Sequence, residues 1–140
     1  MASASSQARD EDAATLNLGP DFQDGRCLLN SEVAIILQHK LEQMRADGKR
    51  PPSNDFLKAH EYVNRVKQFK DKDTIAQIRQ ELENYTPYEF EVAQLGNLCP
   101  EDAEEAKALV PSLALAGRDD VDDAQLTEFL QQLVTRRQLT

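Results

Sequence analysis

Residues 86–113 read Thr86-Pro-Tyr-Glu-Phe-Glu-Val-Ala-Gln-Leu-Gly-Asn-Leu-Cys-Pro-Glu-Asp-Ala-Glu-Glu-Ala-Lys-Ala-Leu-Val-Pro-Ser-Leu113, and the rest of the chain is interpreted around this stretch. It predicts two helices joined at a proline. Thr86, Pro87 and Glu89 have the spacing of a helix start closed by a capping box. An apolar stripe follows at helical spacing, formed by Tyr88, Val92, Leu95 and Cys99, and the polar residues Glu89, Glu91 and Gln94 fall off it.

Pro100 ends the first of these helices and begins the second. Acidic side chains crowd the first turns of the second helix, where negative charge suits the positive end of the helix dipole. Its apolar side is Ala103, Ala106, Leu109 and Val110, and Pro111 ends it. We expect Leu95 and Leu109 to belong to the core of the protein.

Further helices are predicted on both sides of this stretch. Asn30 or Ser31 caps a helix that runs to about Ala46, and its apolar face is broad enough to suggest contacts on more than one side. A proline-rich loop separates it from a helix capped by Ser53 or Asn54. No strand pattern occurs from Leu28 onward, so the fold class is all-α, a compact helical bundle with an extended N-terminal arm.

Two more helix starts come from acidic caps. Asp71 or Asp73 caps the helix that precedes residues 86–113. Asp122 caps the last helix, with Gln125 in the capping-box position. Arg136 and Arg137 near the end of the last helix suit the negative pole of its dipole.

The net charge of −9 is unevenly distributed. Residues 81–123 hold twelve acidic and two basic side chains, whereas residues 40–79 hold ten basic and six acidic ones. Affinity for nucleic acid comes largely from cations that neutralise phosphates. The acidic half therefore argues against a free-standing module that binds DNA or RNA.

No constellation of residues points to catalysis, a cofactor or a metal. Cys27 and Cys99 lack a paired metal-binding spacing and are expected to be reduced, partly buried thiols, and the two histidines lack companions at ligand spacing. The acidic run from Asp119 to Asp123 does not fit a calcium loop in any register. We expect a non-catalytic protein with no small-molecule substrate. Because no apolar run approaches about 20 residues, we also expect no membrane contact and a soluble, intracellular chain.

The chain is predicted to divide into a disordered tail (residues 1–15), an arm with the first helix (16–50) and a helical domain (51–140). Large apolar side chains stand in the arm among glycine, proline and aspartate, which prevent a long helix there. Burying each would contribute about 1.5–3 kcal/mol, so they must lie against something. Two arrangements are open: the arm packs on the chain's own helices, or it lies along a partner, with Leu16-Asn17-Leu18 added as an edge strand.

A basic segment carries Lys58, Arg65, Lys67, Lys70 and Lys72, with Tyr62 and Phe69 interleaved. A solvated helix face, an acidic protein surface and passing RNA all fit this pattern. Lys67, Lys70 and Lys72 are the candidate contacts to RNA or to an acidic surface.

Two motifs, Leu28-Leu29-Asn30-Ser31-Glu32-Val33 and the run from Asn97 to Leu113, resemble the signature of the fourth subunit of eukaryotic RNA polymerase II, a family of stalk subunits. The resemblance implies a fold like the helicase-and-RNase-D C-terminal (HRDC-like) domain. It also implies a tight heterodimer with the seventh subunit of the polymerase, which contacts the emerging RNA, and a role in transcription initiation. The amino-terminal segment and the motif helices would embrace that partner.

The candidate partner-binding residues are apolar side chains in excess of what one small core needs, namely Leu18, Phe22, Leu28, Leu29, Val33, Ile36 and Leu37. The resemblance further implies nuclear localisation with shuttling to the cytoplasm, and involvement in export and decay of transcripts. Two alternatives remain open: the stalk subunit of a specialised plant polymerase, and a generic helical adaptor with no polymerase attachment.

Overall fold

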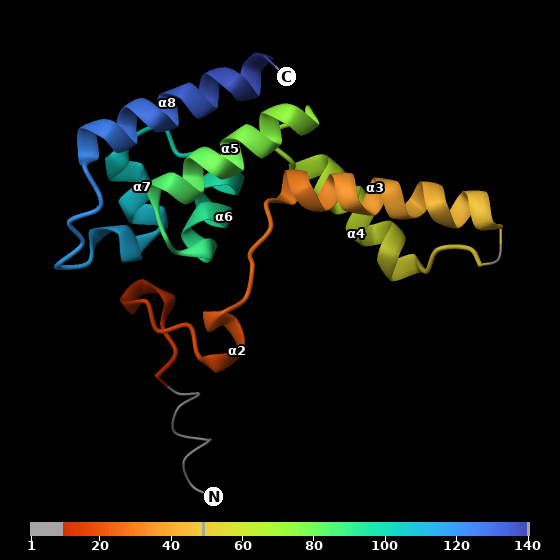
Figure 1. The fold of residues 1–140 in the computed structure, drawn as a ribbon, viewed down its shortest axis with the longest axis horizontal. Helices are drawn as coiled ribbons and strands as arrows, with labels where there is room; N and C mark the ends of the chain where they lie inside the picture. Colours follow the sequence, from red (N-terminus) through yellow and green to blue (C-terminus); the bar gives the residue numbers. More distant parts are fainter. Residues whose placement is uncertain (1–9, 49, 140) are drawn as a thin grey trace, which may run out of the picture.

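The computed structural model describes residues 10–48 and 50–139, and Figure 1 shows their arrangement. The main helices are α3 (Asn30–Asp47), α4 (Asn54–Val66), α5 (Lys72–Tyr85), α6 (Glu89–Leu98), α7 (Ala103–Leu109) and α8 (Asp123–Leu139). Shorter turns are η1 (Ala13–Thr15), α2 (Pro20–Gln23) and η2 (Pro111–Ala114). The all-α prediction is confirmed, whereas the HRDC-like resemblance stays a prediction.

The helices form two parts that meet at the start of α3. Helices α5–α8 gather into a bundle, and α3 and α4 form an antiparallel hairpin that projects from it (Figure 1). The predicted domain boundary at residue 50 falls in the loop of this hairpin. The arm lies beside the bundle, and its turn η1 contacts η2.

The tail prediction is only partly open to comparison. Residues 1–9 lie outside the described residues, and residues 10–15 contain η1, where the Asp12 carboxylate accepts a hydrogen bond from the Ala14 N–H at 3.0 Å. Leu16 follows in the left-handed region, with φ of 63°, so Leu16-Asn17-Leu18 is not a continuous extended strand in this chain. A single bridge pairs Asp12 with Asn17.

The core of the bundle lies between the apolar faces predicted from helical spacing. Each helix contributes side chains that are at most 4% exposed: Ile75, Ile78 and Leu82 from α5, Val92 and Leu95 from α6, Ala103 and Ala106 from α7, and Leu126, Leu130 and Leu133 from α8. The rings of Tyr85 and Phe129 stack at 5.8 Å between α5 and α8.

The prediction that Leu109 is a core residue is wrong. Its side chain is 45% exposed, because α7 ends there and the chain turns so that Val110 and Leu113 fill the core instead.

The corner between α5 and α6 differs from its predicted form. Helix α6 begins at Glu89 rather than at Pro87, and Thr86 does not cap it. The Thr86 hydroxyl is buried and donates a hydrogen bond to the Glu91 carboxylate, and it accepts one from the Tyr88 N–H at 3.3 Å. The predicted capping box fails because the threonine oxygen is engaged by Glu91 and Glu89 contacts the arm.

Glu91 is the second difference at this corner, since it falls off the predicted apolar stripe of α6 and yet is 0% exposed. Its carboxylate accepts hydrogen bonds from the Ser112 hydroxyl at 2.6 Å and from two nitrogens of Arg118 at 2.8 and 3.1 Å. A buried carboxylate is tolerated only when it is paired and hydrogen-bonded. Hydrogen bonds from Arg118 to Asp120 and to Glu91 outweigh burial and raise the Arg118 pKa, so the guanidinium stays charged.

The start of α3 is capped differently from the prediction of Asn30 or Ser31. Leu29 is the first flanking residue, and its N–H donates to Glu32 at 2.8 Å, while the Asn30 N–H donates to the Asn97 side chain of α6 at 2.8 Å. The Ser31 hydroxyl accepts a hydrogen bond from the Phe69 N–H at 3.1 Å. The first donors of α3 are thus satisfied partly from another helix.

Other helix starts follow the local signals. The side chains of Ser53, Asp71 and Asp122 accept hydrogen bonds from the N–H groups of Phe56, Thr74 and Gln125, as predicted. Pro100, by contrast, ends α6 without beginning α7. Cys99 adopts a left-handed φ of 46°, and α7 starts three residues after Pro100 with Asp102 as its cap.

Replacement of Arg118 by methionine should lower the free energy of unfolding by about 3–5 kcal/mol, because it leaves the Glu91 carboxylate buried without its cation. Urea unfolding followed by circular dichroism measures the change. The matched control is Asp120→Asn, which removes the exposed partner of the same arginine and should cost less than about 1 kcal/mol. Adding Glu91→Gln to Arg118→Met should recover part of the loss. A cost below that of Asp120→Asn would contradict the assignment.

Gly96→Ala should destabilise the chain by about 1–3 kcal/mol, although alanine is the better helix former, because overpacking a filled core costs more than the propensity gains. A Cβ at Gly96 would lie 2.3 Å from the Cδ2 of Leu29, which is 0% exposed. Gly25→Ala is the control, since its nearest neighbour would be an ordinary 3.6 Å away. Equal melting temperatures for the two variants would show that the contact between α6 and the arm is not tight.

Candidate partner interface

Helix α3 carries apolar residues on more sides than the chain itself covers. Ala34 and Leu41 are 3% exposed, on the side that packs against α4. At about 100° per residue, Val33, Ile36 and Leu37 share a different side of the helix. Ile36 is 51% exposed and the other two are half-buried. The broad stripe seen in the sequence is therefore only partly used within this chain.

The arm presents a second apolar surface. Phe22 and Leu28 are 67% and 43% exposed, and Leu18 is half-buried. Between the arm and the start of α6 lies a cavity of about 260 Å³ bordered by Leu18, Phe22, Tyr88 and Phe90. Large exposed apolar side chains beside an open apolar cavity are typical of a surface that another protein covers.

Leu29 does not belong to this exposed surface, although the sequence grouped it with the partner-binding residues. It is fully buried and its methyl groups approach Gly96 of α6. Leu29 is therefore part of the chain's own core, and the six remaining candidates keep their place as a predicted interface.

Arg79 of α5 joins the arm to the helices. One of its terminal nitrogens donates to the Cys27 carbonyl and to Glu32, each at 2.6 Å, and the other donates to Glu83 at 3.1 Å and Glu89 at 3.4 Å. Glu89 also accepts from the Cys27 N–H at 3.2 Å. These contacts link the arm with α3, α5 and α6 at one point.

The Arg79 guanidinium is held in its charged form. Burial opposes the charge, but the hydrogen bonds that Arg79 donates to Glu32 and Glu83 outweigh that effect and raise the Arg79 pKa. The arm packs on the chain's own helices at the backbone of Cys27 and Asn30, as in the first arrangement that the sequence left open. The side chains of Phe22 and Leu28 remain exposed, and the arrangement along a partner stays a prediction.

The candidate basic contacts are separated in the structure. Lys67 and Lys70 border a groove between α3 and the linker from α4 to α5, but Lys72 is the first residue of α5 and lies outside that groove. The sequence missed Arg79 and Arg118 as organising residues. Two of their partners are local, Glu83 at helical spacing from Arg79 and Asp120 two residues after Arg118. The partners Glu32 and Glu91, which fix the position of the helices, lie far along the chain.

No helix within residues 10–48 and 50–139 is long and apolar enough to cross a membrane. Over the same residues, no group of three or more His, Cys, Asp or Glu side chains is placed to hold a metal ion.

Burial raises the pKa of the Cys99 thiol to about 11, which keeps it protonated near neutral pH.

The arm and α3 together define a class: an all-helical protein that presents apolar surfaces suited to a second chain. Comparison with known proteins places the chain more closely. The family model described as RNA polymerase Rpb4 matches residues 27–136. The chain is 43% identical over 118 residues to DNA-directed RNA polymerase II subunit 4 of Arabidopsis thaliana, covering 82% of this chain and 86% of that protein.

Two further relatives are also matched over most of their length. DNA-directed RNA polymerase II subunit rpb4 of Dictyostelium discoideum is 35% identical, with 91% of this chain and 90% of that protein covered. The protein of the same name from Schizosaccharomyces pombe is 38% identical, with 91% and 93% covered. The chain belongs to the RNA polymerase Rpb4 family, the non-catalytic fourth subunits of DNA-directed RNA polymerase II.

Arg79→Met should release the arm and lower the free energy of unfolding by about 1.5–3 kcal/mol, because charged hydrogen bonds to Glu32 and to the Cys27 carbonyl are lost. Thermal unfolding measures the stability, and hydrogen exchange over residues 26–30 measures the release. Arg26→Met is the control, since the Arg26 side chain is 70% exposed and Glu83 is its one ion-pair partner among the residues that the structure describes. Unchanged exchange in the Arg79 variant would show that the arm is anchored by other contacts.

Proposed function

We propose that this chain is a stalk subunit of RNA polymerase II that forms a heterodimer with the seventh subunit. The observation that carries the proposal is the apolar side of α3 formed by Val33, Ile36 and Leu37, which the chain's own helices leave partly uncovered. The chain also belongs to the RNA polymerase Rpb4 family. The proposed partner surface continues over the arm through Leu18, Phe22 and Leu28.

The size of the apolar contribution supports this proposal. Fully burying one large apolar side chain contributes about 1.5–3 kcal/mol, and a few such anchors dominate the binding energy of most interfaces. Phe22 and Ile36 are each more than half exposed, so both have surface left to bury against a partner. Arg79 would hold the arm in place before binding and so reduce the ordering cost that a free segment carries.

In this proposal the chain supports transcription initiation and stabilises its partner rather than holding RNA itself. The net charge of −9 opposes binding of a phosphate backbone, so handling of nascent RNA falls mainly to the seventh subunit. The proposed location is the nucleus, where RNA polymerase II acts, with shuttling to the cytoplasm as a further proposal. The alternative is that the chain is the stalk subunit of a specialised plant polymerase. The family match favours both of these polymerase assignments over a generic adaptor.

Ile36→Glu should weaken the heterodimer at least about tenfold, because a carboxylate would have to be desolvated in an apolar contact. Size-exclusion chromatography with light scattering, performed on the chain mixed with the seventh subunit, measures the one-to-one complex. Leu57→Glu is the matched control, since Leu57 is 40% exposed but lies on α4. Full complex formation by both variants would contradict the assignment of this side of α3.

A further inference from the structure

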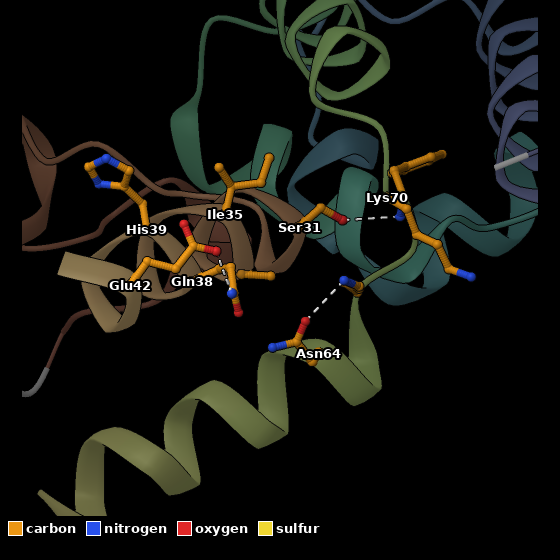
Figure 2. A pocket seen from close by; sticks show the side chains of 10 residues that line it. Ser31, Ile35, Gln38, His39, Glu42, Asn64 and Lys70 are labelled. Carbon is orange, nitrogen blue, oxygen red and sulfur yellow. Dashed lines mark hydrogen bonds between the residues drawn. The ribbon is translucent and has the colours of Figure 1, made fainter. Parts of the chain in front are cut away.

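A groove separate from the proposed heterodimer surface lies between α3 and the linker that joins α4 to α5 (Figure 2). It encloses about 420 Å³, which falls within the roughly 300–1,000 Å³ of ordinary ligand clefts. On α3 it is bordered by Ser31, Ile35, Gln38 and Glu42, which recur every three or four positions and share one side of the helix. Figure 2 shows Asn64 and Lys70 on the other wall.

The groove and the proposed heterodimer surface occupy different sides of α3. With about 100° between successive residues, Ile35 and Gln38 lie nearly opposite Val33 and Leu37 around the helix axis. A partner chain bound to one side therefore leaves the other open. A molecule bound in the groove would therefore be a different one from the heterodimer partner.

The floor of the groove is apolar and its rim is cationic. Ala34 and Phe69 are 3% and 0% exposed and form buried floor, with Ile35 packed partly against the core. Lys67 is half-buried, and its ammonium donates to the neutral Asn64 side chain at 3.0 Å. Lys70 is exposed on the same rim.

Neither rim lysine is paired with a carboxylate among residues 10–48 and 50–139. The nearest acidic residue in sequence, Asp71, is engaged instead by the N–H and hydroxyl of Thr74 at 2.9 and 2.8 Å. Glu42 is the acidic residue bordering the groove, and its carboxylate accepts a hydrogen bond from the Gln38 side chain at 2.7 Å. A half-buried lysine with only a neutral partner is suited to meet an anion from outside.

We propose that this groove binds an acidic peptide segment of another protein, with carboxylates on Lys67 and Lys70 and an apolar side chain on the floor by Ile35. A phosphate is a poorer fit, because bidentate recognition of phosphate uses arginine, and none of the described residues that border the groove is an arginine. RNA is also a poorer fit. Among the described residues, two rings border the groove: Phe69 is fully buried and offers no surface on which a base could stack, and His39 is exposed. A run of bases would therefore have a single small imidazole ring to stack on.

The test uses a fluorescein-labelled peptide of alternating glutamate and leucine, titrated with the full chain and followed by fluorescence anisotropy. The same peptide with glutamine in place of glutamate should bind at least about fivefold more weakly, since two ion pairs are lost. The double variant Lys67→Gln with Lys70→Gln should lose affinity by a similar factor. The matched control, Lys58→Gln with Lys72→Gln, removes the same charge outside the groove and should change the affinity less than about twofold.

Several results would overturn the proposal: no binding of the glutamate peptide, equal weakening by the two double variants, or equal affinity for the glutamine peptide. A labelled uridine oligonucleotide that binds more tightly than the peptide and loses affinity in the Lys67 and Lys70 variant would assign the groove to nucleic acid. Amide shifts in NMR spectra should change at Ser31, Gln38 and Lys70 during the peptide titration, and stay unchanged at Tyr62, which lies about 160° around α4 from Asn64.

Repeating the peptide titration in the presence of the seventh subunit distinguishes binding in the groove from binding at the proposed heterodimer surface. Peptide affinity should be the same with and without the subunit, because the two surfaces lie on opposite sides of α3. Displacement of the peptide by the subunit would show that the groove belongs to the heterodimer interface and would overturn the proposal. Absence of a heterodimer, with peptide binding intact, would contradict the proposed function and leave the groove assignment standing.

Discussion

The buried carboxylate of Glu91 is the interaction on which the arrangement of the bundle depends. It lies in the first turn of α6, 0% exposed, and Arg118 reaches it from a loop that follows η2. Hydroxyls from Thr86 and Ser112 occupy its remaining acceptor positions, and the Arg118 guanidinium also lies 4.9 Å from the centre of the Tyr88 ring. One charged group therefore fixes the α5–α6 corner, η2 and the following loop relative to one another.

Arg79 plays the corresponding part on the other side of α6. Its side chain is 11% exposed and meets three carboxylates, of which Glu32 belongs to α3 and Glu89 to α6. By also holding the Cys27 carbonyl, it fixes where the arm enters α3. The position of α3 relative to the bundle, and with it the direction of the exposed Val33, Ile36 and Leu37 side, thus follows from these contacts together with the packing of Leu29 on Gly96.

Features set by neighbouring residues could be predicted from the sequence, whereas features set by distant contacts could not. The caps at Ser53, Asp71 and Asp122 and the core stripes of α5, α6 and α8 need only local spacing. Thr86 has the same local pattern, but its hydroxyl donates a hydrogen bond to the Glu91 carboxylate instead of capping α6. That carboxylate can be buried because it pairs with Arg118, 27 residues further along the chain. No periodicity signals such a partner. Leu29 was wrongly predicted to lie on the partner surface for a similar reason. Its side chain packs in a space that exists because residue 96, far along the chain, is a glycine without a side chain.

We propose that the seventh polymerase subunit covers the exposed side of α3 and the arm, and hydrogen–deuterium exchange measures this coverage. Exchange of the chain is measured alone and in a mixture with that subunit. We expect slower exchange over residues 18–28 and 30–40 in the mixture, and unchanged exchange over residues 54–66 of α4. Protection confined to α4, or no protection anywhere in the chain, would contradict it.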